Sequence, residues 1–249
     1  NQKGGVGKTT TTINLAAALS QLQKKVLIID LDPQGNASTG LGVEVEDREL
    51  STYEFLVEGV PLEKVTMETE ISGLNIVPAT VDLSSADIDL ISNEKRSHLL
   101  HAALRKKQQD KQKYDYILID CPPSLNILTV NAMVASHSVL IPLQSEFFAL
   151  EGLSQLLLTV KEVRQTANEN LRVEGIVLTM FDGRNNLSKQ VEADARSNLR
   201  ELVFKTIIPR NVRVSEAPSY SMPVLTYDPS SKGSKAYMSL AKELLANNS

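Results

Sequence analysis

Residues Asn1-Gln2-Lys3-Gly4-Gly5-Val6-Gly7-Lys8-Thr9-Thr10 decide the fold of this chain. The glycines allow the backbone to turn successive N–H groups into one concavity, which forms a nest for anionic oxygens. Lys8 adds a mobile positive charge for the β- and γ-phosphates of a nucleotide, and the Thr9 hydroxyl is a ligand for Mg²⁺. A helix that begins near Thr9 directs its positive end at the same anion. The stretch therefore predicts a phosphate-binding loop.

The loop fits the second half of the pattern G-x-x-x-x-G-K-[ST], with one departure. The first glycine of the pattern falls at Gln2, and Lys3-Gly4-Gly5 brings a second lysine close to the phosphates instead. The pattern also requires an apolar helix after the loop, and apolar residues do recur at helical spacing up to Gln23. A glycine-rich turn with chance lysines is the alternative, and it leaves this helix unexplained.

Two acids follow the first expected strand. The continuous apolar run Val26-Leu27-Ile28-Ile29 is typical of a strand buried on both faces, and it leads into Asp30 and Asp32. Open α/β sheets bind their ligands at this carboxyl edge, and the alternation places both acids on one side if the strand continues. From the residues alone these acids serve either phosphate chemistry or a helix cap or turn.

A second strand ends in an acid. The stretch Tyr114-Asp115-Tyr116-Ile117-Leu118-Ile119-Asp120 predicts a Walker B strand, whose Asp120 holds Mg²⁺ through water. The stiff loop Cys121-Pro122-Pro123-Ser124 follows, and we expect it to respond to the γ-phosphate. Cys121 has no histidine nearby in the sequence to activate it, which favours a packed residue over a nucleophile.

The order of the segments predicts an α/β fold, with a doubly wound, mainly parallel sheet and helices on both faces. We interpret residues 1–249 as a single P-loop ATPase domain. Because a phosphate loop is launched from a strand, we also expect an apolar strand upstream of Asn1. Expected strands cover 26–29, 74–78, 114–120, 139–143, 173–180 and 203–208; expected helices cover 9–23, 52–57, 83–91, 99–104, 149–167, 187–202 and 236–245.

Composition excludes several classes of protein. No apolar run approaches the roughly 20 residues that a membrane helix needs. The single cysteine excludes an internal disulfide and suits a reducing cytoplasm. The three histidines, His98, His101 and His137, suggest no metal-binding set.

The second lysine before the glycines is the hallmark of the deviant Walker A group, K-G-G-x-G-K-T, and the chain resembles the ParA/Soj-type partition ATPases. This group is related to the MinD and nitrogenase-iron-protein families. The stretches Asp30–Asn36, Pro209–Ser219 and Tyr227-Asp228-Pro229 match the ParA/Soj pattern as well. A cluster that bridges two subunits needs two thiolates from each, so the lone cysteine counts against an iron-protein function.

The resemblance implies roles for the site residues and names ATP and Mg²⁺ as cofactors. Asp32 is expected to position and activate the attacking water, while Asp30 orders the outer shell of the metal. Lys3 is expected to reach the phosphates held by a second subunit, so the catalytic set is Asp32, Lys3 and Lys8. The loop after Pro209 lies by the adenine in that family. The expected nucleotide contacts are Lys3, Gly4, Gly5, Val6, Gly7, Lys8, Thr9, Thr10, Pro209 and Asn211, and the expected metal set is Thr9, Asp32 and Asp120.

The charge is unevenly distributed. From Arg184 onward ten Lys and Arg stand against six Asp and Glu, a net charge of +4, within a chain whose total is −4. This excess predicts either a basic stripe for DNA phosphates or a set of solvated helix charges. The resemblance favours sequence-independent DNA binding, first through Arg184 and Arg213. Ranked behind them are Arg210, Arg196, Lys232 and Lys235.

The resemblance implies a slow, switch-type ATPase whose ATP-bound homodimer holds double-stranded DNA and releases it on hydrolysis. A ParB-like centromere-binding protein is the implied partner, and the bacterial cytoplasm, on the nucleoid, is the implied location. A MinD-like membrane-associated ATPase is the alternative, but it needs a C-terminal amphipathic helix with a basic face, and residues 236–249 hold one lysine. A small-molecule kinase or ligase on the same scaffold is a second alternative, which needs an acceptor pocket.

Overall fold

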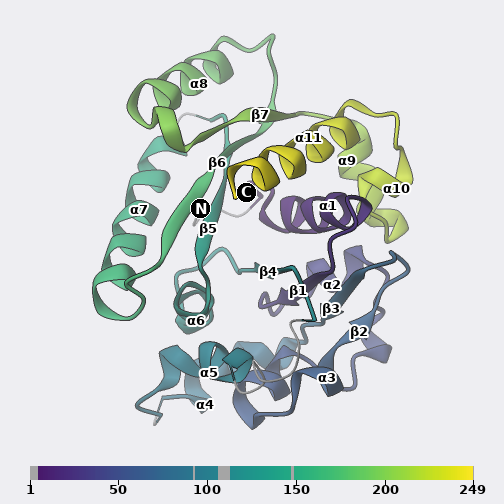
Figure 1. Ribbon diagram of the computed structural model, residues 1–249, viewed down its shortest axis with the longest axis vertical. Coiled ribbons are helices and arrows are strands. Elements are labelled where there is room, and N and C mark those ends of the chain that lie inside the picture. The colour runs from purple at the N-terminus through teal and green to yellow at the C-terminus, as the bar shows by residue number, and fades with distance from the viewer. Residues whose placement is uncertain (1–4, 92, 106–112, 147–148, 249) are drawn as a thin grey trace.

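We describe the fold from a computed structural model, in which residues 5–91, 93–105, 113–146 and 149–248 are described (Figure 1). Strands and helices alternate along these residues, as the sequence predicts. The strands are β1 (Val26–Asp30), β2 (Met67–Glu68), β3 (Leu74–Val77), β4 (Tyr116–Asp120), β5 (Ser138–Gln144), β6 (Arg172–Phe181) and β7 (Val203–Pro209). The α-helices are α1 (Lys8–Gln21), α2 (Asn36–Gly40), α3 (Leu62–Val65), α4 (Ala86–Asp89), α5 (Leu99–Arg105), α6 (Ile127–Ala135), α7 (Ala149–Thr166), α8 (Asn186–Asn198), α9 (Val212–Glu216), α10 (Val224–Tyr227) and α11 (Lys232–Asn247). Short helical turns are η1 (Val45–Asp47), η2 (Glu54–Glu58), η3 (Val81–Ser85), η4 (Arg96–His98), η5 (Arg200–Leu202) and η6 (Ala217–Tyr220).

The strands form two sheets among the described residues. One has the order β2-β3-β1-β4 and the other the order β5-β6-β7. All pairings are parallel except that of β2 with β3, so the prediction of a mainly parallel α/β fold is confirmed. Within the described part of the chain the strands do not form the single sheet that we expected, because there β4 pairs only with β1 and β5 pairs only with β6.

Strand β1 is buried on both faces, as its continuous apolar run predicts. Val26 and Ile28 point into one hydrophobic cluster, while Leu27 and Ile29 point into another on the opposite face. Strand alternation therefore fixes how the helical layers cover this sheet. It also leaves the carboxyl end of β1, with Asp30, in the interior of the molecule.

Helices α1 and α11 lie side by side over a common face of the two sheets (Figure 1). Their cluster includes Val177 of β6 and Phe204 of β7 together with Val26 and Ile28 of β1. Tyr237 of α11 is among the largest fully buried side chains. The two sheets thus share one hydrophobic core, and the first helix packs against the last.

Two predicted helices differ from the structure in their bounds, and local capping explains the first of them. Helix α11 begins at Lys232 rather than at residue 236, because the Ser231 hydroxyl accepts the Ser234 N–H at 3.1 Å and caps the helix. The helix predicted over 187–202 ends at Asn198, and the separate turn η5 completes it. Strand β2 and helix α2 are too short to give a periodic signal.

Candidate functional site

The phosphate-binding loop has the conformation that its glycines predict. Gly5 and Gly7 adopt φ values of +75° and +87°, in the left-handed region that favours glycine. Helix α1 begins at Lys8, and the Val6 carbonyl accepts a 2.9 Å hydrogen bond from the Thr179 hydroxyl of β6. Lys3 and Gly4 lie outside the described residues. The rest of the predicted loop therefore stands at the N-terminus of α1, supported by β6.

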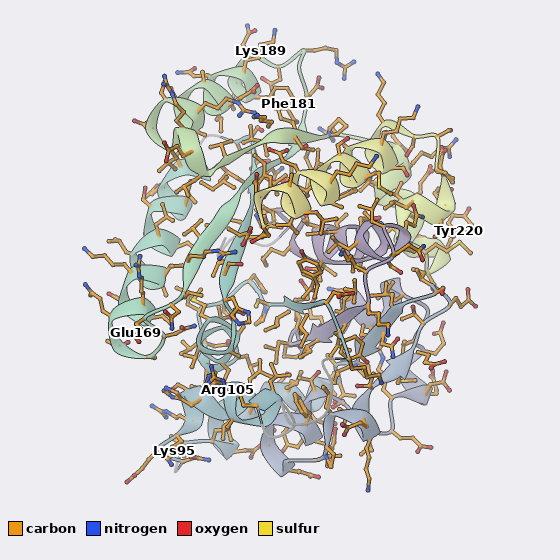
Figure 2. All side chains as sticks on the ribbon, in the orientation of Figure 1. Lys95, Arg105, Glu169, Phe181, Lys189 and Tyr220 are labelled. Atoms are coloured by element: carbon orange, nitrogen blue, oxygen red, sulfur yellow. The ribbon has the colours of Figure 1, made fainter. Side chains whose placement is uncertain are left out.

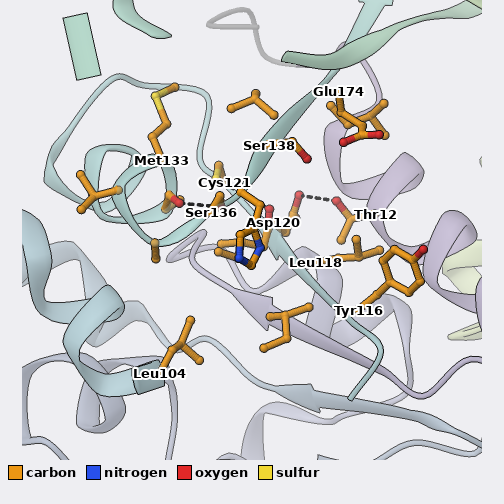
Figure 3. Close-up of a pocket in the computed structure, with 18 of the residues that line it drawn as sticks. Thr12, Leu104, Tyr116, Leu118, Asp120, Cys121, Met133, Ser136, Ser138 and Glu174 are labelled. Carbon is orange, nitrogen blue, oxygen red and sulfur yellow. Dashed lines mark hydrogen bonds between the residues drawn. The ribbon is translucent and has the colours of Figure 1, made fainter. Parts of the chain in front are cut away.

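Asp120 lies next to the first turn of α1. The Thr12 hydroxyl is 3.2 Å from Asp120 Oδ1 (Figure 3). Asp30 is the register partner of Asp120 on the neighbouring strand, and the Asp120 carbonyl accepts the Leu31 N–H at 2.9 Å. The two strands thus bring both acids to the edge of the sheet where α1 begins, as the sequence predicts.

The electrostatics of this edge favour a bound cation. Burial raises the pKa of Asp120 to about 7, and the nearby charge of Asp30 adds to the increase. Burial likewise raises the pKa of Asp30 to about 6. Burial lowers the pKa of Lys8, and the nearby charges of Asp120 and Asp32 only partly oppose this effect. Buried carboxylates and a partly desolvated ammonium therefore share one small volume.

The residues present fit Mg²⁺. Asp120 Oδ2 is buried and has no hydrogen-bond partner among the described residues, which suits an oxygen that faces a hydrated cation. The Thr9 and Thr12 hydroxyls both favour the ionised form of Asp120. No group of three His, Cys, Asp or Glu in the described part of the chain forms a metal cage. Mg²⁺ commonly relies on one or two carboxylates together with waters and substrate phosphates, so this edge suits the expected set of Thr9, Asp32 and Asp120. Their contacts with the metal stay a prediction.

Asp32 sits at the start of a tight turn. Its side chain is buried, and Oδ1 accepts the Gln34 N–H at 3.0 Å. The Asp32 carbonyl accepts the Gly35 N–H at 2.8 Å, and the turn leads directly into α2. The carboxylate is therefore oriented by its own loop, close enough to Lys8 for the two charges to interact.

Asp30 anchors this loop through hydrogen bonds, and its expected place in the outer shell of the metal stays a prediction. One oxygen, Oδ2, accepts the Ser38 N–H at 3.0 Å and the Ser38 hydroxyl at 2.7 Å, while Oδ1 accepts the Asp32 N–H at 3.2 Å. Ser38 Oγ in turn accepts the Ala79 N–H at 3.0 Å. Sequence reasoning missed Ser38, because a serine inside a short helix carries no pattern that marks it as buried.

Cys121 has the properties of a packed residue. The residue is half-buried beside Asp120, and burial raises the pKa of its thiol to about 12. A thiol with so high a pKa is protonated at neutral pH and is a poor nucleophile. The sequence-based interpretation of Cys121 therefore agrees with its surroundings.

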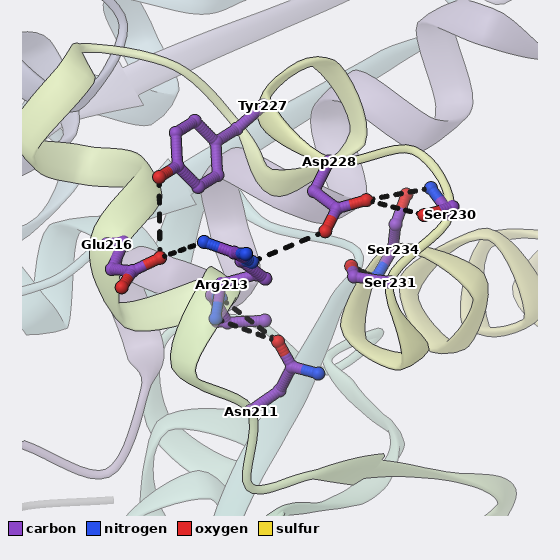
Figure 4. Close-up of polar contacts among 9 residues, drawn as sticks. Asn211, Arg213, Glu216, Tyr227, Asp228, Ser230, Ser231 and Ser234 are labelled. Atoms are coloured by element: carbon purple, nitrogen blue, oxygen red, sulfur yellow. Dashed lines mark hydrogen bonds and ion pairs between the residues drawn. The ribbon is translucent and has the colours of Figure 1, made fainter.

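Asn211 acts as a helix cap at the end of β7. Its Oδ1 accepts the N–H groups of Arg213 and Val214, at 2.9 and 3.4 Å, and so opens α9 (Figure 4). Pro209 ends β7 immediately before it. The contact of Pro209 and Asn211 with adenine stays a prediction.

Arg213 is held by acids of its own chain. Nη1 lies 2.9 Å from Glu216 Oε2, and Nε lies 3.4 Å from Asp228 Oδ2 (Figure 4). The Tyr227 hydroxyl also lies 3.3 Å from Glu216 Oε2. A phosphate that binds the Arg213 guanidinium must therefore compete with two carboxylates.

The other predicted DNA contacts lie on α8, α11 and the loops at the ends of β6 and β7. Arg184 pairs with Asp182 at 2.8 Å, and hydrogen bonds from Arg184 lower the pKa of Asp182 to about 2. The Arg210 N–H donates to the Phe181 carbonyl, which places it beside this pair. Arg196 pairs with Glu192 within α8 at 2.9 Å. Lys232 and Lys235 are exposed in the first turns of α11. Figure 2 shows Phe181 at the same end of the molecule as the outward-pointing Lys189.

A groove of about 1440 Å³ runs along β4 and β5 (Figure 3). Strand β4 and the Cys121–Ser124 loop line it, together with α6, the first residues of β5 and part of α1. Ile117, in the middle of β4, is 40% exposed, although strand β1 next to it is completely buried. The groove is therefore bordered by one edge of β4 and one edge of β5, and neither edge pairs with another strand among the described residues.

No helix in the described residues is long and apolar enough to span a bilayer.

Comparison with known proteins places these features in a wider group. A family model described as an AAA domain matches residues 1–173. The sporulation initiation inhibitor protein Soj of Bacillus subtilis is 51% identical over 247 residues, which cover 99% of this chain and 96% of that protein. The chromosome partitioning protein ParA of Caulobacter vibrioides is 51% identical over 246 residues, covering 99% and 92%. A solved structure, described as cobyrinic acid a,c-diamide synthase from Mycobacterium smegmatis with bound ADP and magnesium, has a TM-score of 0.84 and 36% identity, covering 99% and 92%.

Proposed function

This chain belongs to the ParA/Soj family of P-loop proteins, and from that premise we propose that it is an ATPase that partitions DNA. The observation that carries the proposal is the convergence of Lys8, Asp32 and Asp120 at the N-terminus of α1. A P-loop next to two strands that each end in an aspartate is suited to bind a nucleotide with Mg²⁺ rather than a phosphate alone. The ADP and magnesium of the Mycobacterium smegmatis structure are consistent with this choice of cofactor.

The residues of this chain have separate parts in hydrolysis. The N–H groups of residues 4–10 and the Lys8 ammonium bind and orient the phosphates, while Asp32 orients the attacking water. Thr9, Asp120 and Asp32 would hold Mg²⁺, directly or through water, and the bound ion would neutralise charge on the phosphate oxygens. The Asp32 carboxylate is oriented by a loop rather than by a strand. We therefore expect ATP hydrolysis to be slow and to depend on the position of that loop.

Dimerisation and DNA binding complete the proposed cycle. Lys3 of each subunit contacts the phosphates held by the other, and the joined pair offers twice the basic surface for DNA phosphates. Arg184 and Arg213 contribute first, and Arg210, Arg196, Lys232 and Lys235 support them. Binding of this kind depends on phosphate contacts and weakens steeply with salt. A ParB-like protein would stimulate hydrolysis and so release DNA, on the nucleoid of a bacterial cytoplasm.

The test is DNA binding compared without nucleotide, with ADP and with a non-hydrolysable ATP analogue, with the size of the protein measured in parallel. We expect a dimer and DNA retention only with the ATP analogue and Mg²⁺. The double variant Arg184→Glu, Arg213→Glu should keep the dimer and lose the DNA. A protein that stays monomeric with the analogue would contradict the proposal.

Two other functions would give different results in the same assays. Binding to anionic liposomes without binding to DNA would favour a MinD-like membrane ATPase. Phosphoryl transfer to an added small molecule rather than to water would favour a kinase or ligase, a possibility raised by the synthase description of the Mycobacterium smegmatis structure.

We further propose that a parallel strand, supplied by chain N-terminal to Asn1, fills the groove between β4 and β5. Two observations support this proposal: one edge each of β4 and β5 has no partner strand in the described ranges, and Ile117 is exposed. Such a strand would join the two sheets into one and lead directly into the phosphate-binding loop. A chain extended by an apolar strand should unfold at a higher denaturant concentration and protect the β4 amides from exchange, and unchanged exchange would contradict the proposal.

A further inference from the structure

A buried arginine outside the phosphate-binding loop contacts the segment that carries Asp32. Arg48 follows η1, and only 7% of its surface is exposed. Its Nη1 donates to the Ala79 carbonyl at 3.0 Å, and its Nη2 donates to Thr39 Oγ1 at 2.8 Å and to the Val43 carbonyl at 2.7 Å. One guanidinium thus joins the chain after β3 to α2 and to the residues that follow α2.

The same guanidinium supports the turn that begins at Asp32. Gly35 has a φ of +62°, and a side chain at this position would overlap Arg48 Nη1. The Gly35 N–H closes the turn on the Asp32 carbonyl at 2.8 Å, and the Gln34 N–H binds Asp32 Oδ1 at 3.0 Å. The orientation of the Asp32 carboxylate therefore depends on a turn that rests directly on Arg48.

Stability is a weak explanation for a charge in this place. No described carboxylate forms an ion pair with Arg48, and Arg48 Nε is buried without a hydrogen bond in the described part of the chain. Burial lowers the pKa of Arg48, which reflects the unfavourable environment of its charge. An apolar side chain would avoid this penalty. The planar guanidinium of Arg48, however, can donate to three neutral oxygens in fixed directions, and the ammonium of a lysine cannot reproduce that geometry.

We infer that Arg48 is a positioning residue for ATP hydrolysis, since it fixes the turn at Gly35 and through it the carboxylate of Asp32. The inference rests on the proposed ATPase function. It adds to that function a residue, Arg48, that influences hydrolysis without contacting the nucleotide. Arg48 acts through Asp32, so its loss changes the rate of hydrolysis more than the affinity for nucleotide.

The direct test is Arg48→Lys, with Arg164→Lys as the matched control. Arg164 lies exposed on α7, and its Nε donates to the Glu169 carbonyl at 3.3 Å. We expect Arg48→Lys to lower kcat for ATP by about tenfold or more, because small misplacements of reacting groups have effects of that size. The Kd for a fluorescent ADP analogue should change by less than about twofold, as expected for a residue outside the binding contacts. The control should match the wild-type protein in both.

A second comparison separates positioning from general structural support. In the Asp32→Ala background, adding Arg48→Lys should leave the residual turnover unchanged, because the group that Arg48 positions is absent. A further decrease there, or a normal kcat for Arg48→Lys alone, would overturn the inference. If Arg48→Lys does not fold, Thr39→Val removes one acceptor of the guanidinium, and its kcat should fall while ADP affinity is kept; an unchanged kcat in Thr39→Val would overturn the inference. Absence of turnover in the wild-type protein would instead contradict the proposed ATPase function, and the inference with it.

Discussion

Replacing Ser38 by alanine tests how much the fold depends on the buried network beneath the Asp32 loop. Ser38, Asp30 and Ala79 are all completely buried. The substitution removes a 2.7 Å hydrogen bond to a carboxylate and leaves the Ala79 N–H, now bound at 3.0 Å, without an acceptor. A buried donor without a partner costs about 1–3 kcal/mol, and a hydrogen bond to a charged group contributes about 1.5–3 kcal/mol. Asp30 keeps the N–H groups of Ser38 and Asp32, so we expect the lower part of the combined range, about 3 kcal/mol of unfolding free energy.

The assay is urea unfolding of the wild-type protein, Ser38→Ala and the matched variant Ser239→Ala. The Ser239 hydroxyl donates to the Lys235 carbonyl at 3.0 Å on the exposed side of α11. Its removal should change the unfolding free energy by less than about 0.5 kcal/mol, as surface substitutions usually do. A midpoint shift for Ser38→Ala as small as that for Ser239→Ala would refute the reasoning. That result would mean that Asp30 and Ala79 find other partners when the hydroxyl is lost.

Three further predictions concern the nucleotide site and the basic surface. Lys8→Ala should weaken binding of a fluorescent ATP analogue by about tenfold or more, since a contact to a charged group contributes about 1.5–3 kcal/mol; unchanged affinity would remove Lys8 from the phosphate site. Asp32→Ala should still bind ATP and accumulate as a dimer by size-exclusion chromatography, with hydrolysis lowered by about 100-fold or more; wild-type turnover would show that another group orients the water. The pair Glu216→Gln with Asp228→Asn should tighten DNA binding at low salt. The new amide oxygens can still accept hydrogen bonds from Arg213, but the two negative charges that compete with DNA phosphates for Arg213 are removed. The exposed pair Glu162→Gln with Glu169→Gln removes the same two negative charges and is the charge-matched control. A gain that persists in an Arg213→Ala background would mean that Glu216 and Asp228 repel DNA directly.

The sequence by itself determined the framework and the chemistry at its edge. The glycines and Lys8 predicted the loop, the apolar run before Asp30 predicted a strand covered on both faces, and the strand ending at Asp120 predicted the second acid. Each of these predictions depends on a short stretch of sequence, because a glycine-rich turn, a buried strand and an acid at its end each involve only a few neighbouring residues.

Only the tertiary structure decided how these pieces are held. The role of Asp30 as an anchor depends on Ser38 of α2 and on Ala79, which follows β3. The pairing of Arg213 with Asp228 joins α9 to a turn fifteen positions later, and no periodicity in either segment indicates it. Contacts between distant segments depend on side-chain direction and on the path of the whole chain, and a short sequence pattern contains neither.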